Sequence, residues 1–184
     1  MSLEIASASR EAPEPPLFVA NAGLVLLSPF FPHLFERLGL LTGSDQNAPR
    51  VDDADSISRA VHLLEYLVTG RLDTPAPQLT LNKLLAGVSL SAEIAPRIDP
   101  PTTDLEICDG LLAAAIANWP SIRSTTPAGL RETFLQREGR LRSLDDQWEL
   151  HVQRKTVDVL VDQIPWSLAT VFHRWMPGPV RVVW

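Results

Sequence analysis

The sequence predicts an α+β domain, in which four to five short helices precede a small antiparallel β-sheet with one short helix. Between residues 17 and 139, apolar side chains recur three and four positions apart, in segments bounded by glycine and proline, as in short helices. After Gly139 the apolar spacing changes to two, which is typical of strands. The 184 residues suffice for one domain with a substantial core. We therefore expect a single module over residues 17–184, helical over 17–139 and mainly β over 140–184.

The composition excludes several classes of protein. With 45% hydrophobic and 21% charged residues, the chain is neither polar enough to be disordered nor apolar enough to be integral to a membrane. A net charge of -6 argues against nucleic acid as the main partner, because the phosphate backbone attracts basic surfaces. The single cysteine, Cys108, cannot form an internal disulfide, so we expect a reducing compartment such as the cytoplasm.

The beginning of the chain is predicted to be a flexible tail over residues 1–16, since it is polar and ends in a proline-rich run. The next stretch, Leu17–Pro32, is the only one that resembles a signal or membrane segment. Asn21 and Pro29 interrupt it, and more acidic than basic side chains precede it, so we expect no membrane insertion.

The clearest helix signal covers Asp52–Thr69. Acidic residues occupy its first turn, and Gly70 stands where a helix C-cap belongs. Shorter helices are expected at about Pro32–Leu38, ending at Gly39, and around Leu81–Leu85. These segments predict the first part of the helical layer.

Two further helices carry start signals of their own. Thr103 and Glu106 have the spacing of a capping box, which predicts a helix that ends at Pro120. Thr126 is the expected N-cap of the last helix of this part, and we expect that helix to end at Gly139.

The rest of the chain predicts strands. Residues 148–152 alternate apolar and polar side chains, and we expect them to form a hairpin with residues 141–144. Apolar positions over 157–164 indicate a short helix. Aromatic and β-branched residues predict two more strands, Trp166–Phe172 and Val180–Trp184.

No motif predicts a catalytic, cofactor-binding or metal site. The nearest approach to a serine-hydrolase turn, residues 87–91, has serine in place of the second glycine, and no glycine run matches a phosphate-binding loop. A calcium-loop pattern that starts at Asp53 lacks its later oxygen ligand and glycine. Cys108 lies on an apolar stripe, as core cysteines do; a small cytoplasmic hydrolase that uses Cys108 is the alternative.

Three groups of side chains are candidates for contact with another protein. Arginines gather between residues 123 and 142, either as a solvated surface or as a docking patch for an acidic protein. His62 and Tyr66 lie four apart on a second helix face, which rests in solvent, on another element or on a partner. Late tryptophans fit a sheet core or an interface hot spot. The candidate interaction residues are Arg131, Phe134, Arg137, Arg140, His62, Tyr66, Trp166, Trp175 and Trp184.

Several stretches resemble the contractile injection system tape measure protein family, in the same order along the chain. They include VANAGLVLLSPF at 19–30, RAVHLLEYL at 59–67, LNKLLAG at 81–87, GLRETFLQREG at 129–139 and IPWS at 164–167. The most specific block covers residues 131–139. Positions that carry the resemblance include Asn21, Gly23, Pro29, Leu64, Asn82, Lys83, Trp119, Glu132, Gly139 and Pro165.

The resemblance implies a non-enzymatic, cofactor-free structural or assembly component of a phage tail-like particle. Such a component would be made in the cytoplasm. It would dock inside the inner tube, or at the baseplate hub, spike or tube end, and several copies of the chain could form an oligomer within the tube. A chaperone or adaptor of the same particle is the alternative. Even as one helix, 184 residues reach only about 276 Å at ~1.5 Å per residue. A role in tube-length determination therefore implies the terminal module of a longer ruler, or a short relative that caps the tube.

The arginine-bearing helix and the last strand are the expected contact surfaces. A chain that ends within a strand, at Trp184, would leave a sheet edge to which another subunit adds a strand.

Overall fold

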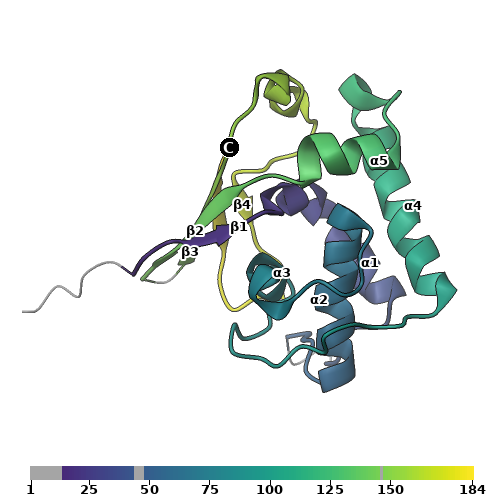
Figure 1. Cartoon of the computed structure of the whole chain (residues 1–184), viewed down its shortest axis with the longest axis vertical. Helices are drawn as coiled ribbons and strands as arrows, with labels where there is room; N and C mark the ends of the chain where they lie inside the picture. The colour runs from purple at the N-terminus through teal and green to yellow at the C-terminus, as the bar shows by residue number, and fades with distance from the viewer. Residues whose placement is uncertain (1–13, 44–47, 146) are drawn as a thin grey trace, which may run out of the picture.

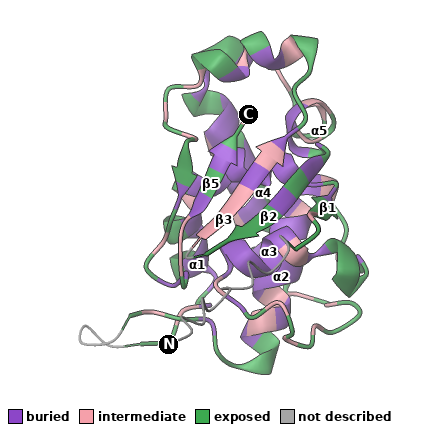
Figure 2. Ribbon diagram, turned by 90° about the vertical axis from the view of Figure 1, so that its left-hand side faces the viewer, coloured by how far each residue is buried: buried purple, intermediate pink, exposed green. Residues whose placement is uncertain are grey.

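In the part of the chain that the structure describes, a layer of helices packs against one face of a five-stranded sheet, so the fold is α+β as predicted (Figure 1). The computed structural model describes residues 14–43, 48–145 and 147–184. Most of the expected tail over 1–16 lies outside these residues. In Figure 2 the sheet stands in front of the helices, and its near face carries no helix.

The described residues contain five α-helices, in the part of the chain where helices were expected. They are α1 (Phe31–Arg37), α2 (Ala54–Thr69), α3 (Thr80–Leu85), α4 (Thr102–Asn118) and α5 (Pro127–Leu130). A long 3-10 segment, η1 (Ala22–Phe30), leads into α1 and is buried over most of its length.

The predicted C-terminal end of α2 is confirmed, while its first residue is Ala54, two positions after the predicted start at Asp52; local capping chemistry fixes both ends. The Asp53 carboxylate accepts a hydrogen bond from the Ser56 amide at 2.9 Å, which satisfies a free N–H of the first turn. Gly70 ends the helix with φ 74°, a left-handed conformation that glycine adopts without a Cβ clash.

One predicted boundary is wrong in each of two other helices, namely the start of α4 and the end of α5, whereas the stop of α4 just before Pro120 is confirmed. Helix α4 begins at Thr102, directly after Pro101, so Thr103 lies inside the first turn and no side chain caps the helix. The cap of α5 by Thr126 is confirmed, but this helix continues into a π-helical turn, η4 (Arg131–Leu135), and stops there. Gly139 is instead the first residue of a strand.

The sheet contains β1 (Leu17–Val19), β2 (Gly139–Leu144), β3 (Gln147–Val152), β4 (Thr170–Val171) and β5 (Val180–Val183), in the order β1-β2-β3-β5-β4. The predicted β2–β3 hairpin is confirmed. The sheet is not wholly antiparallel, because β3 and β5 are parallel neighbours. The connection between them holds the 3-10 turns η5 (Thr156–Val159) and η6 (Val161–Gln163), where one short helix was expected.

Two other strand predictions need correction. Residues 17–19, placed in the helical part, form the edge strand β1 and pair antiparallel with β2. The expected strand Trp166–Phe172 is reduced to Thr170–Val171. Trp166 lies outside it because its ring packs edge-on against Phe30 and its indole N–H donates to the Leu26 carbonyl.

The core lies between the sheet and the helices. Leu141, Leu150 and Val182 of three neighbouring strands are in register and buried on the inner face. Trp119 at the end of α4 is fully buried against Phe134 of η4, with ring centroids 5.0 Å apart. This packing leaves the opposite face of the sheet outside the core.

Candidate protein interaction surface

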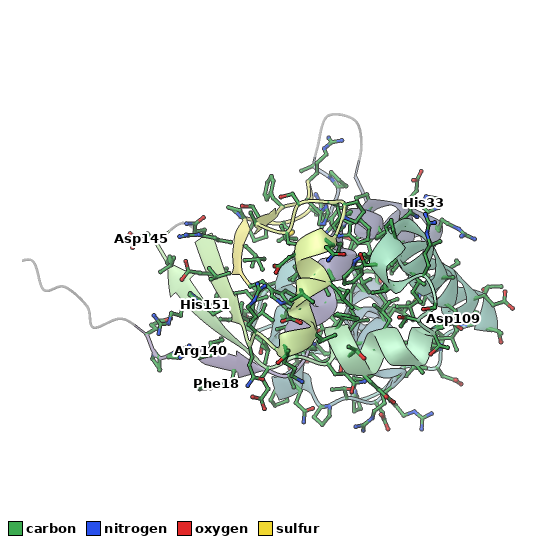
Figure 3. The ribbon with its side chains drawn as sticks, turned by 90° about the horizontal axis from the view of Figure 1, so that it is seen from above. Phe18, His33, Asp109, Arg140, Asp145 and His151 are labelled. Carbon is green, nitrogen blue, oxygen red and sulfur yellow. The ribbon has the colours of Figure 1, made fainter. Side chains whose placement is uncertain are left out.

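The uncovered side of the sheet carries a row of side chains that the strand register brings together. Phe18, Arg140, His151 and Val183 are successive partners across β1, β2, β3 and β5. Phe18 is 75% exposed, whereas a phenylalanine side chain is usually buried in the core. A groove of about 450 Å³ is lined by all four. Figure 3 places Phe18, Arg140 and His151 on the side of the strands away from His33 and Asp109 of the helical layer.

A second row, one pleat further along the strands, is charged. Arg142 of β2, Glu149 of β3 and Arg181 of β5 are cross-strand partners. Glu149 lies 2.5 Å from His151 and 3.2 Å from Arg181, and the hydrogen bond from His151 lowers the pKa of Glu149. Arg140 and Arg142 form no ion pair within the described residues. We call these two rows the open sheet face, and its net charge is positive.

Among the strands of the described residues, β1 and β4 are the edges of the sheet, and neither has a further strand beside it there. The prediction of a free edge at Val180–Trp184 is wrong, because β5 lies between β3 and β4 and the Val182 amide also donates to the Ala169 carbonyl at 2.9 Å. Strand β4 has only two residues, whereas β1 continues the row that contains Phe18. The edge next to the open sheet face is therefore β1.

Arg137 does not belong to a docking patch, because its side chain is completely buried. Its guanidinium donates to both oxygens of Asp158, at 2.6 and 2.9 Å, and to the carbonyls of Thr133 and Gln153. Trp184 donates its indole N–H to the same carboxylate at 2.8 Å. Burial acts to raise the pKa of Asp158, but the hydrogen bonds from Arg137, the Lys155 amide and Trp184 outweigh it, and the pKa lies below its ordinary value.

Arg131 and His62 also have internal partners, which the sequence could not reveal. Arg131 donates to the carbonyls of Tyr66 and Leu67 at 3.0 and 3.1 Å, and so completes the C-terminal end of α2. Its guanidinium lies 5.1 Å from the centre of the Tyr66 ring. His62 is fully buried, and its Nε2 lies 2.7 Å from the Ala95 carbonyl. The expected second face of α2 is thus covered by the chain itself.

The aromatic candidates are parts of the core or its border. Phe134 and Trp175 are buried, and the Trp175 ring stacks on Phe35 at 4.8 Å. Trp166 and Trp184 are half-buried, and both use their indole N–H groups within the chain. Of the nine candidate interaction residues, Arg140 belongs to the open sheet face, and Trp184 lines the same groove beside it. Phe18, His151 and Val183 were missed; the apolar run Leu17–Val19 after a proline was the available signal for β1.

Several positions that carry the family resemblance meet in the fold. Asn21 and Asn82 both donate to the Glu65 carboxylate, at 2.8 and 3.2 Å. The three residues are far apart in the sequence: Asn21 precedes η1, Glu65 lies in α2 and Asn82 lies in α3. Lys83 is buried and donates to the carbonyls of Leu90 and Ala92. The other positions are the buried Leu64 and Trp119, Pro29 within η1, the exposed Glu132 and Pro165, and the tightly packed Gly23 and Gly139.

The structure gives no support to the hydrolase alternative. Cys108 is fully buried on the inner side of α4, and burial raises the pKa of its thiol to about 12. A thiol with this pKa is not a nucleophile near neutral pH. Within the described ranges, no group of three His, Cys, Asp or Glu side chains is placed to hold a metal ion. No helix of the described part is long and apolar enough to cross a bilayer.

Together these features define a small α+β module whose distinctive exposed feature is a basic and aromatic sheet face with a free edge strand. The chain belongs to the contractile injection system tape measure protein family, whose pattern matches residues 2–184. It is therefore a structural protein of a contractile injection system and associates with other subunits of that particle. No curated protein and no solved structure gives a significant match.

Proposed function

We propose that this module docks onto another subunit of the particle through the open sheet face and the β1 edge, and so anchors the tape measure at the baseplate hub or tube end. The observation that carries the proposal is Phe18. It is a large aromatic side chain, 75% exposed, on a free edge strand beside the exposed Arg140. Aromatic residues and arginine dominate binding energy at protein interfaces.

The dimensions of the fold favour an anchor over a span. The longest helix, α4, has 17 residues, which corresponds to about 26 Å at ~1.5 Å per residue. A domain built of such elements cannot extend along a long tube, but it can fix one end of a longer assembly. A copy or oligomer bound in the tube end would set where tube growth starts or stops.

The test is particle assembly with charge and polarity changes on the open sheet face. Phe18→Asp combined with Arg140→Glu is expected to reduce the yield of particles at least tenfold, or to give tubes of abnormal length in electron micrographs. The matched control is Val159→Asp combined with Arg123→Glu, since Val159 is 59% exposed and both residues lie outside the sheet. Normal tubes from the sheet variant, with the protein folded, would reject the proposal.

A chaperone or adaptor that leaves before the particle is complete is the second candidate. Mass spectrometry of purified particles separates the two roles. We expect this chain to be present in finished particles at a constant ratio to a baseplate protein. Its absence from particles that need it for assembly would establish the chaperone role instead. Synthesis and assembly in the cytoplasm belong to both proposals.

A further inference from the structure

A small polar pocket opens beside the edge strand β1. It has a volume of about 200 Å³. Its floor consists of three buried polar residues, Asn21, Glu65 and Thr74, while the exposed Gln78 and Gln136 stand at its rim. Asn21 follows β1 by two positions, so the pocket lies next to the edge that we assign to docking.

The orientation of the Asn21 amide is fixed by its neighbours. Its Nδ2 donates to Glu65 Oε2 at 2.8 Å and to Asn82 Oδ1 at 2.6 Å. The opposite orientation would place an oxygen against these two acceptors. Asn21 Oδ1 is therefore an acceptor, and it is buried with no partner among the described residues.

One further floor atom has unmet hydrogen-bonding capacity. Thr74 Oγ1 is buried and has no partner within the described part of the chain. Glu65 accepts from Asn21 and Asn82 at Oε2, and the hydroxyl of Thr69, which also lines the pocket, is a further donor to this carboxyl group. Gln136 uses its Nε2 on the Val68 carbonyl and so offers its Oε1 as an acceptor at the rim. The pocket is therefore rich in acceptors.

The chemistry of the floor selects among ligands. A divalent cation needs several carboxylate or carbonyl oxygens, and the pocket has one carboxylate. Arg71 also lines the pocket, but its Nε donates to Asp73 at 3.1 Å. A primary ammonium group has three donors and no acceptor, which matches the unpaired Asn21 Oδ1 and Thr74 Oγ1 together with the Glu65 carboxyl group, whose ionised form a bound ammonium would stabilise.

We propose that this pocket binds a primary ammonium group, supplied by a lysine side chain of the neighbouring subunit that covers β1. This assignment rests on the proposed docking function. A segment laid along β1 passes the pocket mouth, so one of its side chains can enter while its backbone pairs with the strand. The contact adds specificity, because a partner without a basic side chain here leaves the floor acceptors unpaired.

The first experiment uses purified protein and methylammonium chloride, followed by ¹H–¹⁵N NMR. We expect saturable shifts of amide signals that are confined to Asn21, Thr74, Gln136 and their neighbours. Tetramethylammonium chloride, with the same charge and no N–H donors, and sodium chloride at equal ionic strength are expected to give no saturable shift. Failure to saturate, or equal shifts with either control salt, would show that the pocket holds only water or ions without selectivity and would overturn the proposal.

Two variants connect the binding to the floor atoms. Glu65→Gln keeps an oxygen for Asn21 and Asn82 but replaces Oε1 by a donor, and we expect methylammonium binding to weaken at least tenfold. Thr74→Val removes the unpaired hydroxyl at nearly constant volume, and a smaller loss, about threefold, is expected. Unchanged binding in both variants, with the wild-type amide spectrum retained elsewhere, would contradict the assignment.

The source of the ammonium group is tested in assembling particles. Glu65→Gln is expected to lower the yield of particles. If the wild type binds methylammonium but the Glu65→Gln variant gives a normal yield of particles, the assignment of the ammonium group to a subunit lysine is overturned. The Phe18→Asp and Arg140→Glu variant should bind methylammonium as the wild type does. If the Phe18→Asp and Arg140→Glu variant fails to assemble while Glu65→Gln assembles normally, docking occurs without the lysine contact. If the wild type does not bind methylammonium, the pocket proposal fails and the docking proposal is unaffected.

Discussion

Replacing Arg137 with methionine should destabilise the fold by about 3–5 kcal/mol, the range expected when one partner of a buried ion pair is removed. The guanidinium makes five hydrogen bonds, two of them to Asp158, and neither side chain of the pair is exposed. Methionine fills much of the same space but provides no donor. The Asp158 carboxylate would then stay buried without a counter-charge, with Trp184 and a backbone amide as its remaining donors.

The measurements are urea unfolding and thermal melting at pH 7, both followed by tryptophan fluorescence. In a chain of this size each kcal/mol lowers the melting temperature by about 2–4 °C, so we expect a decrease of about 6–20 °C. Arg140→Met, on the open sheet face, is the control and should change the unfolding free energy by less than ~0.5 kcal/mol. The double variant Arg137→Met with Asp158→Asn removes both charges and should regain part of the loss.

The pH dependence provides a second criterion. Because the folded-state pKa of Asp158 lies below its ordinary value, its carboxylate contributes stability above about pH 4 that is lost as the pH falls through the folded-state pKa. The difference between wild type and Arg137→Met should therefore shrink in acid. A loss below ~1 kcal/mol at pH 7, or a double variant no more stable than Arg137→Met, would refute the reasoning.

Two further predictions concern tight packing and a buried carboxyl group. Gly23→Ala would place a Cβ 1.9 Å from the Phe134 carbonyl oxygen, so we expect the unfolding free energy to fall by at least ~3 kcal/mol, or the variant not to fold, in thermal melts. Gly110→Ala is the control, because a Cβ there meets nothing within 4 Å, and it should be neutral or stabilising. Equal melting temperatures of the two variants would contradict this prediction. Burial raises the pKa of Glu65 and outweighs the hydrogen bonds from Asn21 and Asn82, so its contribution to stability is present at low pH and is lost as the pH rises through the raised pKa. Glu65→Gln should therefore gain stability relative to wild type between pH 4 and pH 8 in urea titrations, and a constant difference would disprove it.

Local chemistry made part of the fold predictable. The ends of α2 follow from Asp53 and Gly70, and the start of α5 follows from Thr126, because each of these residues acts on backbone within one turn of itself. The change of period after Gly139 likewise predicted the β2–β3 hairpin. These signals need no information from distant parts of the chain.

The missed features depend on partners far away in the sequence. Strand β1 has only three residues, too few for a periodic signal, and exists because β2 pairs with it. The parallel arrangement of β3 and β5 depends on the path of the connection between them. Arg137 looked like a surface charge, since its sequence neighbours do not reveal that Asp158 meets it in the core. The open sheet face likewise depends on the register of strands that are far apart in the sequence, so of its residues only Arg140 was among the predicted interaction residues.

The pairing of Leu17 with Leu141 also has a kinetic consequence. The β2–β3 hairpin can form early from neighbouring residues, whereas β1 must close a loop that contains the whole helical layer. Until that closure occurs, one side of β2 offers unpaired backbone to any other chain. During refolding at high protein concentration, association with other chains therefore competes with the pairing of β1 and β2. Dilute conditions favour the monomer.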